Sequence, residues 1–415
     1  MRKKILALVA LLVIISITTF SGCIDESGST QEDYEPNLES KTNVIDANNQ
    51  FAMDLYSKYS SVGGNIFFSP YSISSALSMT YEGARGETAE EMQQVLHLPD
   101  DKEKIRSDFS SFYSELNKAN KPYKLTTANA LWAQTDYPFL EEYFGTVEEY
   151  YDGKVENLDF RSDTENSRIT INDWVENKTE GKIKDLIPYD MLTDSTRLVL
   201  TNTIYFKANW SNQFETSETR EQDFKLDSGE TVVVEMMHNT DFYNYGKTGG
   251  LQILEMPYKG DDISMLVLLP KGGIIPGEGS LNKLEDSFGT DKLDDLKDDM
   301  SGEIVQVSLP KFNFETKYFM KDDLEEMGMS TAFKYPKADF TGMSPTDELY
   351  IDDVIHQTFV KVNEAGTEAA AATAVVGEMG ISRPKTFTAD HPFIFIIQER
   401  DTGAILFLGR VSDPS

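Results

Sequence analysis

The sequence has little of what most enzymes and disulfide-stabilised proteins depend on. Its 415 residues include one cysteine and four histidines. A single cysteine excludes an intrachain disulfide, so the core alone must stabilise the fold. The sequence contains no G-x-S-x-G, H-E-x-x-H or G-x-x-x-x-G-K-[ST] motif. These absences argue against the common hydrolases, zinc peptidases and nucleotide-binding enzymes, and we predict no metal and no cofactor.

Basic residues are also scarce. The chain has 38 Lys and Arg against 70 Asp and Glu, a formal net charge of −32. Nucleic acids and heparin-like polyanions are bound through basic patches. The charge therefore argues against both as partners.

The N-terminus carries the signature of an exported protein. Arg2, Lys3 and Lys4 precede the apolar run 5–20, which is short against the roughly 20 residues that span a bilayer. Residues 1–22 are thus predicted to be a signal peptide. Because Phe-Ser-Gly-Cys resembles a lipobox, Cys23 is the predicted lipid-attachment residue; an ordinary cleaved signal and an uncleaved anchor are the alternatives.

Behind Cys23 the chain is acidic and polar, and residues 23–44 are predicted to form a disordered tether. No second linker or repeat follows, so 45–412 is predicted to be one domain. The expected location is extracellular or on the cell surface, with the membrane contacted only through the lipid.

Helical and strand patterns are mixed along this domain. Helices are expected at 46–59, from a Ser69 N-cap with Pro70 to Gly83, and after a capping box formed by Thr88 and Glu91. Further expected elements are listed by range: helices at 138–151, 171–183, 281–300 and 318–329, and strands at 125–133, 197–210, 224–238, 251–257, 263–270, 303–310 and 349–362. Without strict β-α-β alternation, this mixture predicts an α+β fold.

One stretch organises the rest. Residues 360–381 follow an apolar strand pattern and contain Gly366, Thr367, Glu368 and the alanines Ala369, Ala370, Ala371 and Ala372. Alanine favours a helix, but the preceding strand and the pair Val375-Val376 favour an extended segment. As a strand, Thr367, Ala369 and Ala371 face one way and can be buried. Glu368 then lies on the opposite, outward row.

These residues carry a family resemblance. E-A-G-T-E-A-A-A-A-T at 364–373 resembles the hinge of the serpins, protein inhibitors of serine and cysteine proteases. H-P-F-I-F at 391–395 and I-L-F-L-G-R-V at 405–411 resemble the serpin C-terminal signature. The resemblance covers 45–412. It implies a large, mostly antiparallel central sheet with further sheets, about eight to nine helices and an exposed reactive loop.

The resemblance also implies a mechanism. The hinge, Glu364 and Gly366 to Ala372, would enter the large sheet after a protease cuts the loop, and the attached enzyme would be trapped as its acyl intermediate. Small inward-facing hinge residues are typical of inhibitory members. The expected function is suicide-substrate inhibition of extracellular serine proteases, and the expected partner is a target serine protease bound covalently by a monomer.

The scissile bond is predicted between Gly380 and Ile381, with Met379-Gly380 as the alternative. Small or unbranched apolar residues there suit subtilisin-, elastase- or chymotrypsin-like enzymes. Arg383 precedes Pro384, which argues against a trypsin-like target.

By the same resemblance, Ser69, Ser72, Asn202 and His356 form the shutter, a polar cluster below the point where the sheet opens. Trp210 lies at the breach, where insertion begins. Core packing is the simpler explanation for both.

Other functions stay open at this point. A non-inhibitory serpin acting as a binding protein or chaperone is the alternative, a lipid-anchored hydrolase is a third, and cysteine proteases are a second target class.

Overall fold

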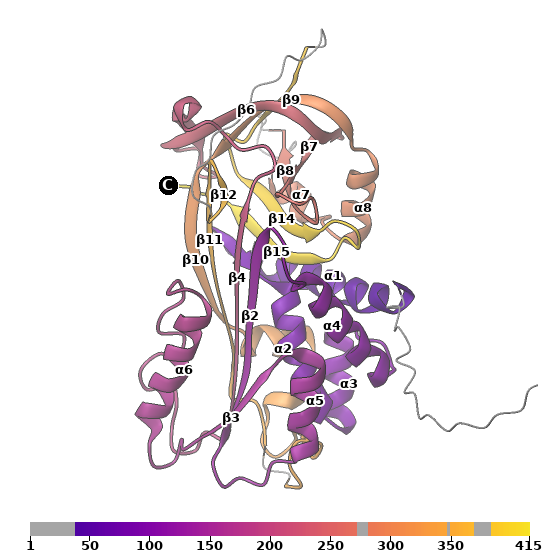
Figure 1. The fold of residues 1–415 in the computed structure, drawn as a ribbon, viewed down its shortest axis with the longest axis vertical. Helices are drawn as coiled ribbons and strands as arrows, with labels where there is room; N and C mark the ends of the chain where they lie inside the picture. The colour runs from indigo at the N-terminus through magenta and orange to yellow at the C-terminus, as the bar shows by residue number, and fades with distance from the viewer. Residues whose placement is uncertain (1–37, 272–280, 347–348, 369–382) are drawn as a thin grey trace, which may run out of the picture. The chain divides into compact units, whose positions relative to one another are not determined.

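The computed structural model describes residues 38–271, 281–346, 349–368 and 383–415 (Figure 1). Its α-helices are α1 (Leu38–Ser60), α2 (Pro70–Gly83), α3 (Gly86–Val95), α4 (Lys102–Leu116), α5 (Glu141–Tyr151), α6 (Thr164–Lys178), α7 (Leu281–Glu285), α8 (Thr290–Asp298) and α9 (Lys321–Met327). Two 3-10 helices are η1 (Thr216–Glu218) and η2 (Thr331–Phe333).

The strands described by the structure build two sheets. They are β1 (Ile66–Phe68), β2 (Tyr123–Gln134), β3 (Lys154–Leu158), β4 (Leu198–Asn209), β5 (Arg220–Lys225), β6 (Thr231–Thr248), β7 (Leu251–Pro257), β8 (Ile263–Pro270), β9 (Ser301–Pro310), β10 (Phe312–Phe319), β11 (Val354–Asn363), β12 (Gly366–Thr367), β13 (Lys385–Thr388), β14 (Phe393–Glu399) and β15 (Ile405–Val411).

The six-stranded sheet has the order β10-β11-β12-β4-β2-β3. Most neighbours are antiparallel, but β2 pairs with β3, and β11 with β4, in parallel. The strands are rich in apolar and β-branched residues because both faces are covered. On β2, Leu131 packs in the cluster that contains α2, whereas Trp132 packs against Trp174 of α6. Figure 1 shows α2 and α6 on opposite sides of this sheet.

The nine-stranded sheet has the order β1-β15-β14-β8-β7-β6-β9-β13, with β5 paired to β6. Its central strands β8, β14 and β15 are buried along their whole length. Phe67, Phe395 and Phe407 stack in the layer between the two sheets. This core holds β4 and β11 in place from one side.

The predicted α+β class is confirmed. The expected strands at 251–257 and 263–270 have the bounds of β7 and β8. Ser69 caps α2 by accepting a hydrogen bond from the Ser72 N–H, as predicted. The predicted 281–300 helix is instead two short helices, α7 and α8.

The predicted capping box was wrong. Helix α3 begins at Gly86, so Thr88 and Glu91 lie inside it. Thr88 Oγ1 accepts a hydrogen bond from the Asp339 N–H, and Glu91 accepts two from Thr331. Both side chains serve tertiary contacts that local spacing does not encode.

Two further observations concern the N-terminal side. Helix α1 begins at Leu38, inside the segment assigned to a tether, and Val44 and Ile45 are buried. Within the described ranges, no helix has the length and apolar character needed to cross a bilayer.

Candidate functional site

The turn that leads into β12 is closed by the side chain of Asn363. Its Oδ1 accepts hydrogen bonds from the backbone N–H groups of Ala365 (3.0 Å) and Gly366 (3.2 Å). Gly366 has φ +152°, and a Cβ there would lie 2.0 Å from the Ala208 carbonyl oxygen. Only glycine fits a backbone that approaches β4 so closely.

Strand β12 lies between β11 and β4 and is antiparallel to both. Thr367 pairs with Val362 on one side and with Ala208 on the other. The first two residues after the turn are therefore already part of the six-stranded sheet, and the extended interpretation holds for them. Ala369 to Ala372 lie outside the described residues, as do Met379, Gly380, Ile381 and Cys23.

Thr367 faces the core, as predicted for the inward row. Its side chain is buried, and its hydroxyl lies 2.7 Å from the Tyr258 hydroxyl. Burial raises the pKa of Tyr258, which keeps the phenol protonated. The Tyr258 ring stacks on Trp210, with centroids 4.4 Å apart. Trp210 Nε1 also donates to the Asn363 carbonyl (3.0 Å), so the predicted breach residue contacts the hinge turn directly.

Glu368 lies on the face opposite Thr367, the outward row of the predicted strand. Its side chain is nevertheless only 5% exposed, because it pairs with Lys182 Nζ at 2.5 Å. Lys182 belongs to residues 179–197, the α6–β4 linker, which covers this face of the sheet. Glu368 also has φ +56°, a left-handed conformation. The extended strand ends at Thr367.

Glu364 is held at the top of the sheet. Lys311 Nζ lies 3.5 Å from its carboxylate, and Thr219 Oγ1 donates to it at 2.9 Å. Burial alone raises the pKa of Glu364, but hydrogen bonds from its own backbone and from Thr219, with the charge of Lys311, lower it overall. The carboxylate stays ionised and fixes the end of β11.

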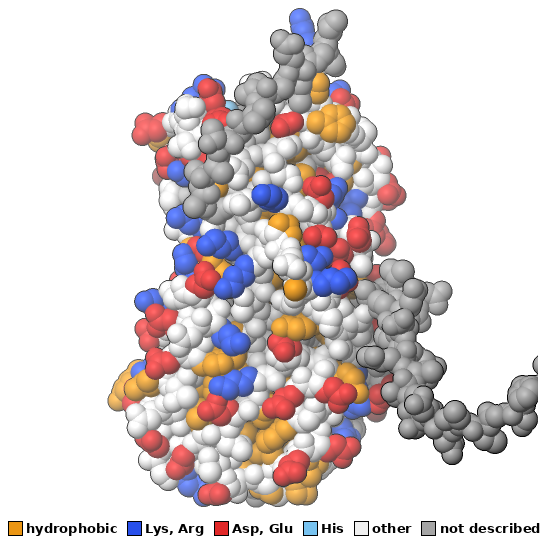
Figure 2. Space-filling model, in the orientation of Figure 1, with side chains coloured by type: hydrophobic (Ala, Val, Ile, Leu, Met, Phe, Trp, Pro, Cys, Tyr) orange, Lys and Arg blue, Asp and Glu red, His pale blue; other side chains and the backbone are white. Residues whose placement is uncertain are grey.

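Below β12, strands β11 and β4 pair directly over Val354–Thr358 and Leu200–Ile204. The Lys182 ammonium lies 5.2 Å from the ring centroid of Phe359, the next residue of β11. Figure 2 shows Lys and Arg side chains gathered between the upper end of α6 and β12. Charged side chains thus cover the region just below β12, where β11 and β4 begin to pair directly.

The four predicted shutter residues lie together in the directly paired region. His356 Nδ1 donates to Asn202 Oδ1 (2.6 Å), and His356 Nε2 accepts from the Ser69 N–H (3.0 Å). Asn202 Nδ2 lies 2.5 Å from Ser72 Oγ. Burial lowers the pKa of His356 to about 3, so the ring is neutral.

Sequence reasoning missed two members of this cluster. Asn129 Oδ1 accepts from Asn202 Nδ2 (2.5 Å), and Asn129 Nδ2 donates to Ser75 Oγ (3.2 Å). Because Asn129 pairs with Asn202 across the strands, the polar ladder runs from β11 through β4 to β2. An asparagine in an otherwise apolar strand was the available signal.

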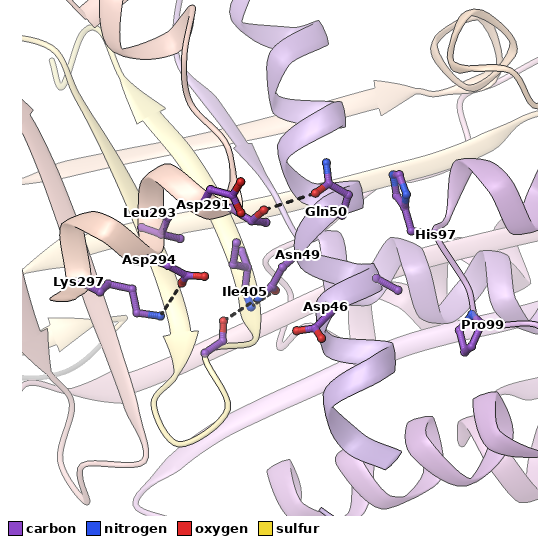
Figure 3. Close-up of a pocket in the computed structure, with 13 residues that line it drawn as sticks. Asp46, Asn49, Gln50, His97, Pro99, Asp291, Leu293, Asp294, Lys297 and Ile405 are labelled. Atoms are coloured by element: carbon purple, nitrogen blue, oxygen red, sulfur yellow. Dashed lines mark hydrogen bonds and ion pairs between the residues drawn. The ribbon is translucent and has the colours of Figure 1, made fainter. Parts of the chain in front are cut away.

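A separate cavity of about 520 Å³ lies between α1, α8 and the turn from β14 to β15 (Figure 3). Asp46, Asp291, Asp294 and Lys297 are among its lining residues. Burial and the charge of Asp294 raise the pKa of Asp46. The cavity shares no lining residue with the hinge.

Across the described ranges, no group of three His, Cys, Asp or Glu side chains is placed to hold a metal ion.

Comparisons with known proteins agree on one family. A family model described as Serpin (serine protease inhibitor) matches residues 46–414. A serpin-like protein of Thermococcus kodakarensis is 45% identical over 376 residues, which cover 89% of this chain and 86% of the relative. The leukocyte elastase inhibitor of Homo sapiens is 39% identical over 375 residues, covering 89% and 98%.

Solved structures show the same relationship. Serpin48 of the insect Tenebrio molitor superposes with a TM-score of 0.80 at 33% identity, covering 91% of this chain and all of the other.

Proposed function

The chain belongs to the serpin family, and from this premise we propose that it traps extracellular serine proteases of the subtilisin, elastase or chymotrypsin type as their acyl intermediates. Serpins are protease inhibitors rather than enzymes, and inhibitors are among the relatives of this chain. The target class, the extracellular action and the trapping step are the proposed part.

One observation carries the proposal. Gly366 and Thr367 are already hydrogen-bonded between β11 and β4, with the inward side chain buried. Continuing the same strand by the small residues Ala369 to Ala372 requires β11 and β4 to separate. On the inward face it brings only small side chains into the core, because Glu368 lies on the opposite face.

The chemistry of trapping follows from the protease's own reaction. Its serine attacks the carbonyl carbon of the scissile peptide, the C–N bond breaks, and the new amine leaves with a proton from the enzyme's base. An ester now joins the protease to the residue before the cut. If the hinge side of the loop enters the sheet, the protease is carried away with its active site distorted, and water no longer completes deacylation.

The residues at the predicted bond set the target class. Gly380 or Met379 before the cut suits enzymes with apolar or small primary pockets. Arg383 is followed by Pro384, and a peptide bond to proline is a poor substrate. Trypsin-like enzymes are therefore expected to be poor targets.

The test uses the mature protein with subtilisin, elastase, chymotrypsin and trypsin. An SDS-resistant adduct of inhibitor and protease with one of the first three, and none with trypsin, is the expected result. N-terminal sequencing of the released fragment identifies the bond. Cleavage without any adduct contradicts trapping and favours a non-inhibitory serpin.

We also propose that the protein is exported and held at the cell surface by a lipid on Cys23. The lipobox-like sequence and the single cysteine support this. Detergent-phase partitioning of the native protein, lost in Cys23→Ser, is the expected result. If the native protein and Cys23→Ser both remain in the aqueous phase, Cys23 is not lipidated and this proposal is wrong.

A further inference from the structure

The hinge is held by contacts on both faces of the sheet. On the core face, the Thr367 hydroxyl bonds to Tyr258 at 2.7 Å. On the opposite face, the Glu368 carboxylate pairs with Lys182 at 2.5 Å. The first contact resists withdrawal of β12, and the second involves the residue that would be next to enter.

Glu368 cannot enter the sheet in its present conformation. Its φ of +56° lies in the left-handed region, whereas a strand between β11 and β4 needs an extended backbone near φ about −140°. Left-handed backbone is unfavourable for a residue with a Cβ. The Lys182 ion pair and the bond from the Glu368 N–H to the Lys361 carbonyl (2.8 Å) compensate for it.

The partner of Glu368 is itself anchored to the sheet. Glu180, two residues before Lys182, accepts a hydrogen bond from Tyr205 of β4 (3.0 Å) and pairs with Lys124 of β2 (2.6 Å). These bonds fix the α6–β4 linker to β4 and β2, on one side of the point where the sheet must open, while Lys182 lies over Phe359 of β11 on the other side. Freeing Glu368 and moving the linker are coupled through Lys182.

We propose that the Lys182–Glu368 ion pair is a catch that stops loop entry after Thr367 and sets the rate at which entry resumes. This inference rests on the proposed function, because it regulates the same insertion step. Opening the pair releases Glu368 to become extended, and the Thr367–Tyr258 contact directs the hinge forward rather than out.

The catch predicts salt dependence. Lys182 is 36% exposed in its side chain, so dissolved ions reach one side of the pair. Spontaneous insertion of the wild type is expected to accelerate with ionic strength, whereas variants without the pair lose this dependence.

The experiment follows spontaneous conversion without protease, at a temperature where the wild type converts measurably. Loss of inhibitory titre and gain of thermal resistance are recorded for Lys182→Met and Glu368→Gln. Both are expected to convert about tenfold faster than the wild type. Lys184→Gln is the matched control, since Lys184 pairs with Glu176 at 2.9 Å on the same linker without touching the hinge; it should convert at the wild-type rate.

A charge-swapped double variant, Lys182→Glu with Glu368→Lys, should return the rate towards that of the wild type. If Lys182→Met and Glu368→Gln convert at the wild-type rate while the wild type still forms SDS-resistant adducts, the catch is wrong and the proposed function stands. If the wild type forms no adduct and gains no thermal resistance, both are wrong. If the charge-swapped protein does not fold, the conversion rates of the two single variants still test the proposed role of the ion pair.

Discussion

The hydroxyls of Thr367 and Tyr258 lie 2.7 Å apart in a part of the core closed by the Trp210 ring. This bond joins the first inward-facing residue of the hinge to the strand-to-turn junction after β7. On its core face the hinge is therefore held by a short polar contact in an apolar environment.

Replacing Thr367 by Arg is expected to convert the inhibitor into a substrate. An unpaired charge at this position costs several kcal/mol, about 3–5 in buried sites, so insertion slows and water completes deacylation before the cut loop enters the sheet. The measurement is the fraction of protein that forms an SDS-resistant adduct. Thr386→Arg, on the exposed face of β13, is the control that should trap normally; equal trapping by both variants would count against the hinge assignment.

Gly366→Ala is expected to destabilise the top of the six-stranded sheet by about 1–3 kcal/mol. A methyl group would lie 2.0 Å from the Ala208 carbonyl oxygen, so β12 must leave or β4 must shift. Urea unfolding followed by fluorescence measures the change. Gly145→Ala, inside α5 with nothing within 4 Å, should be neutral or slightly stabilising, and a similar loss there would contradict the steric explanation.

Asn129→Ala is expected to cost about 1–3 kcal/mol because it removes two buried hydrogen bonds, one from the Asn202 amide and one to the Ser75 hydroxyl. The loss should also ease separation of β4 from its neighbours and speed spontaneous insertion. Thermal unfolding and conversion rates test both effects. Asn166→Ala, which removes exposed bonds to Asp163, should change neither.

The neutral His356 ring predicts acid sensitivity. Its folded pKa of about 3 lies below the ordinary value of 6.5, so below pH 6.5 the unfolded chain binds a proton that the folded chain does not. Stability is then lost as the pH falls from 6.5 towards 3, by up to about 1.4 kcal/mol per pH unit. Above pH 6.5 both states are neutral and this group has no effect.

Urea midpoints at pH 7, 6 and 5 measure that slope. His356→Gln should be less stable than the wild type at pH 7 but lose less stability on acidification. Parallel pH dependence of the two proteins would mean that His356 is not the titrating group.

Cutting the loop is expected to raise the melting temperature by about 10 °C or more, since each added kcal/mol raises the Tm of a large domain by roughly 2 °C or more. Calorimetry of intact and nicked protein gives the answer, and nicked Thr367→Arg should gain much less. An unchanged Tm after nicking would remove the argument for a metastable resting state.

Much of the scaffold could be predicted from the sequence because hydrophobic spacing determines it. Strands β7 and β8 and the Ser69 cap of α2 depend on local pattern, and the structure has them where the pattern indicated. Thr88 and Glu91 show the limit, since their tertiary partners override an equally good local signal.

The sequence was enough to predict which residues belong to the candidate site, but not which side chains they contact. The family resemblance named Thr367 and His356, but the stop at Glu368 depends on Lys182, which is distant in sequence and carries no motif. Asn129 was missed because its importance arises only from its register opposite Asn202.

The parallel pairing of β11 with β4 has a consequence for how such a protein can evolve. A segment entering between them must run against both, replacing one slanted ladder by two perpendicular ones. The gain then belongs to main-chain hydrogen bonds, which substitutions other than those to proline leave intact. Substitutions can therefore change the rate at which the resting form converts to the inserted form. Such single substitutions in β4 or β11 cannot remove the free-energy gain that drives the conversion.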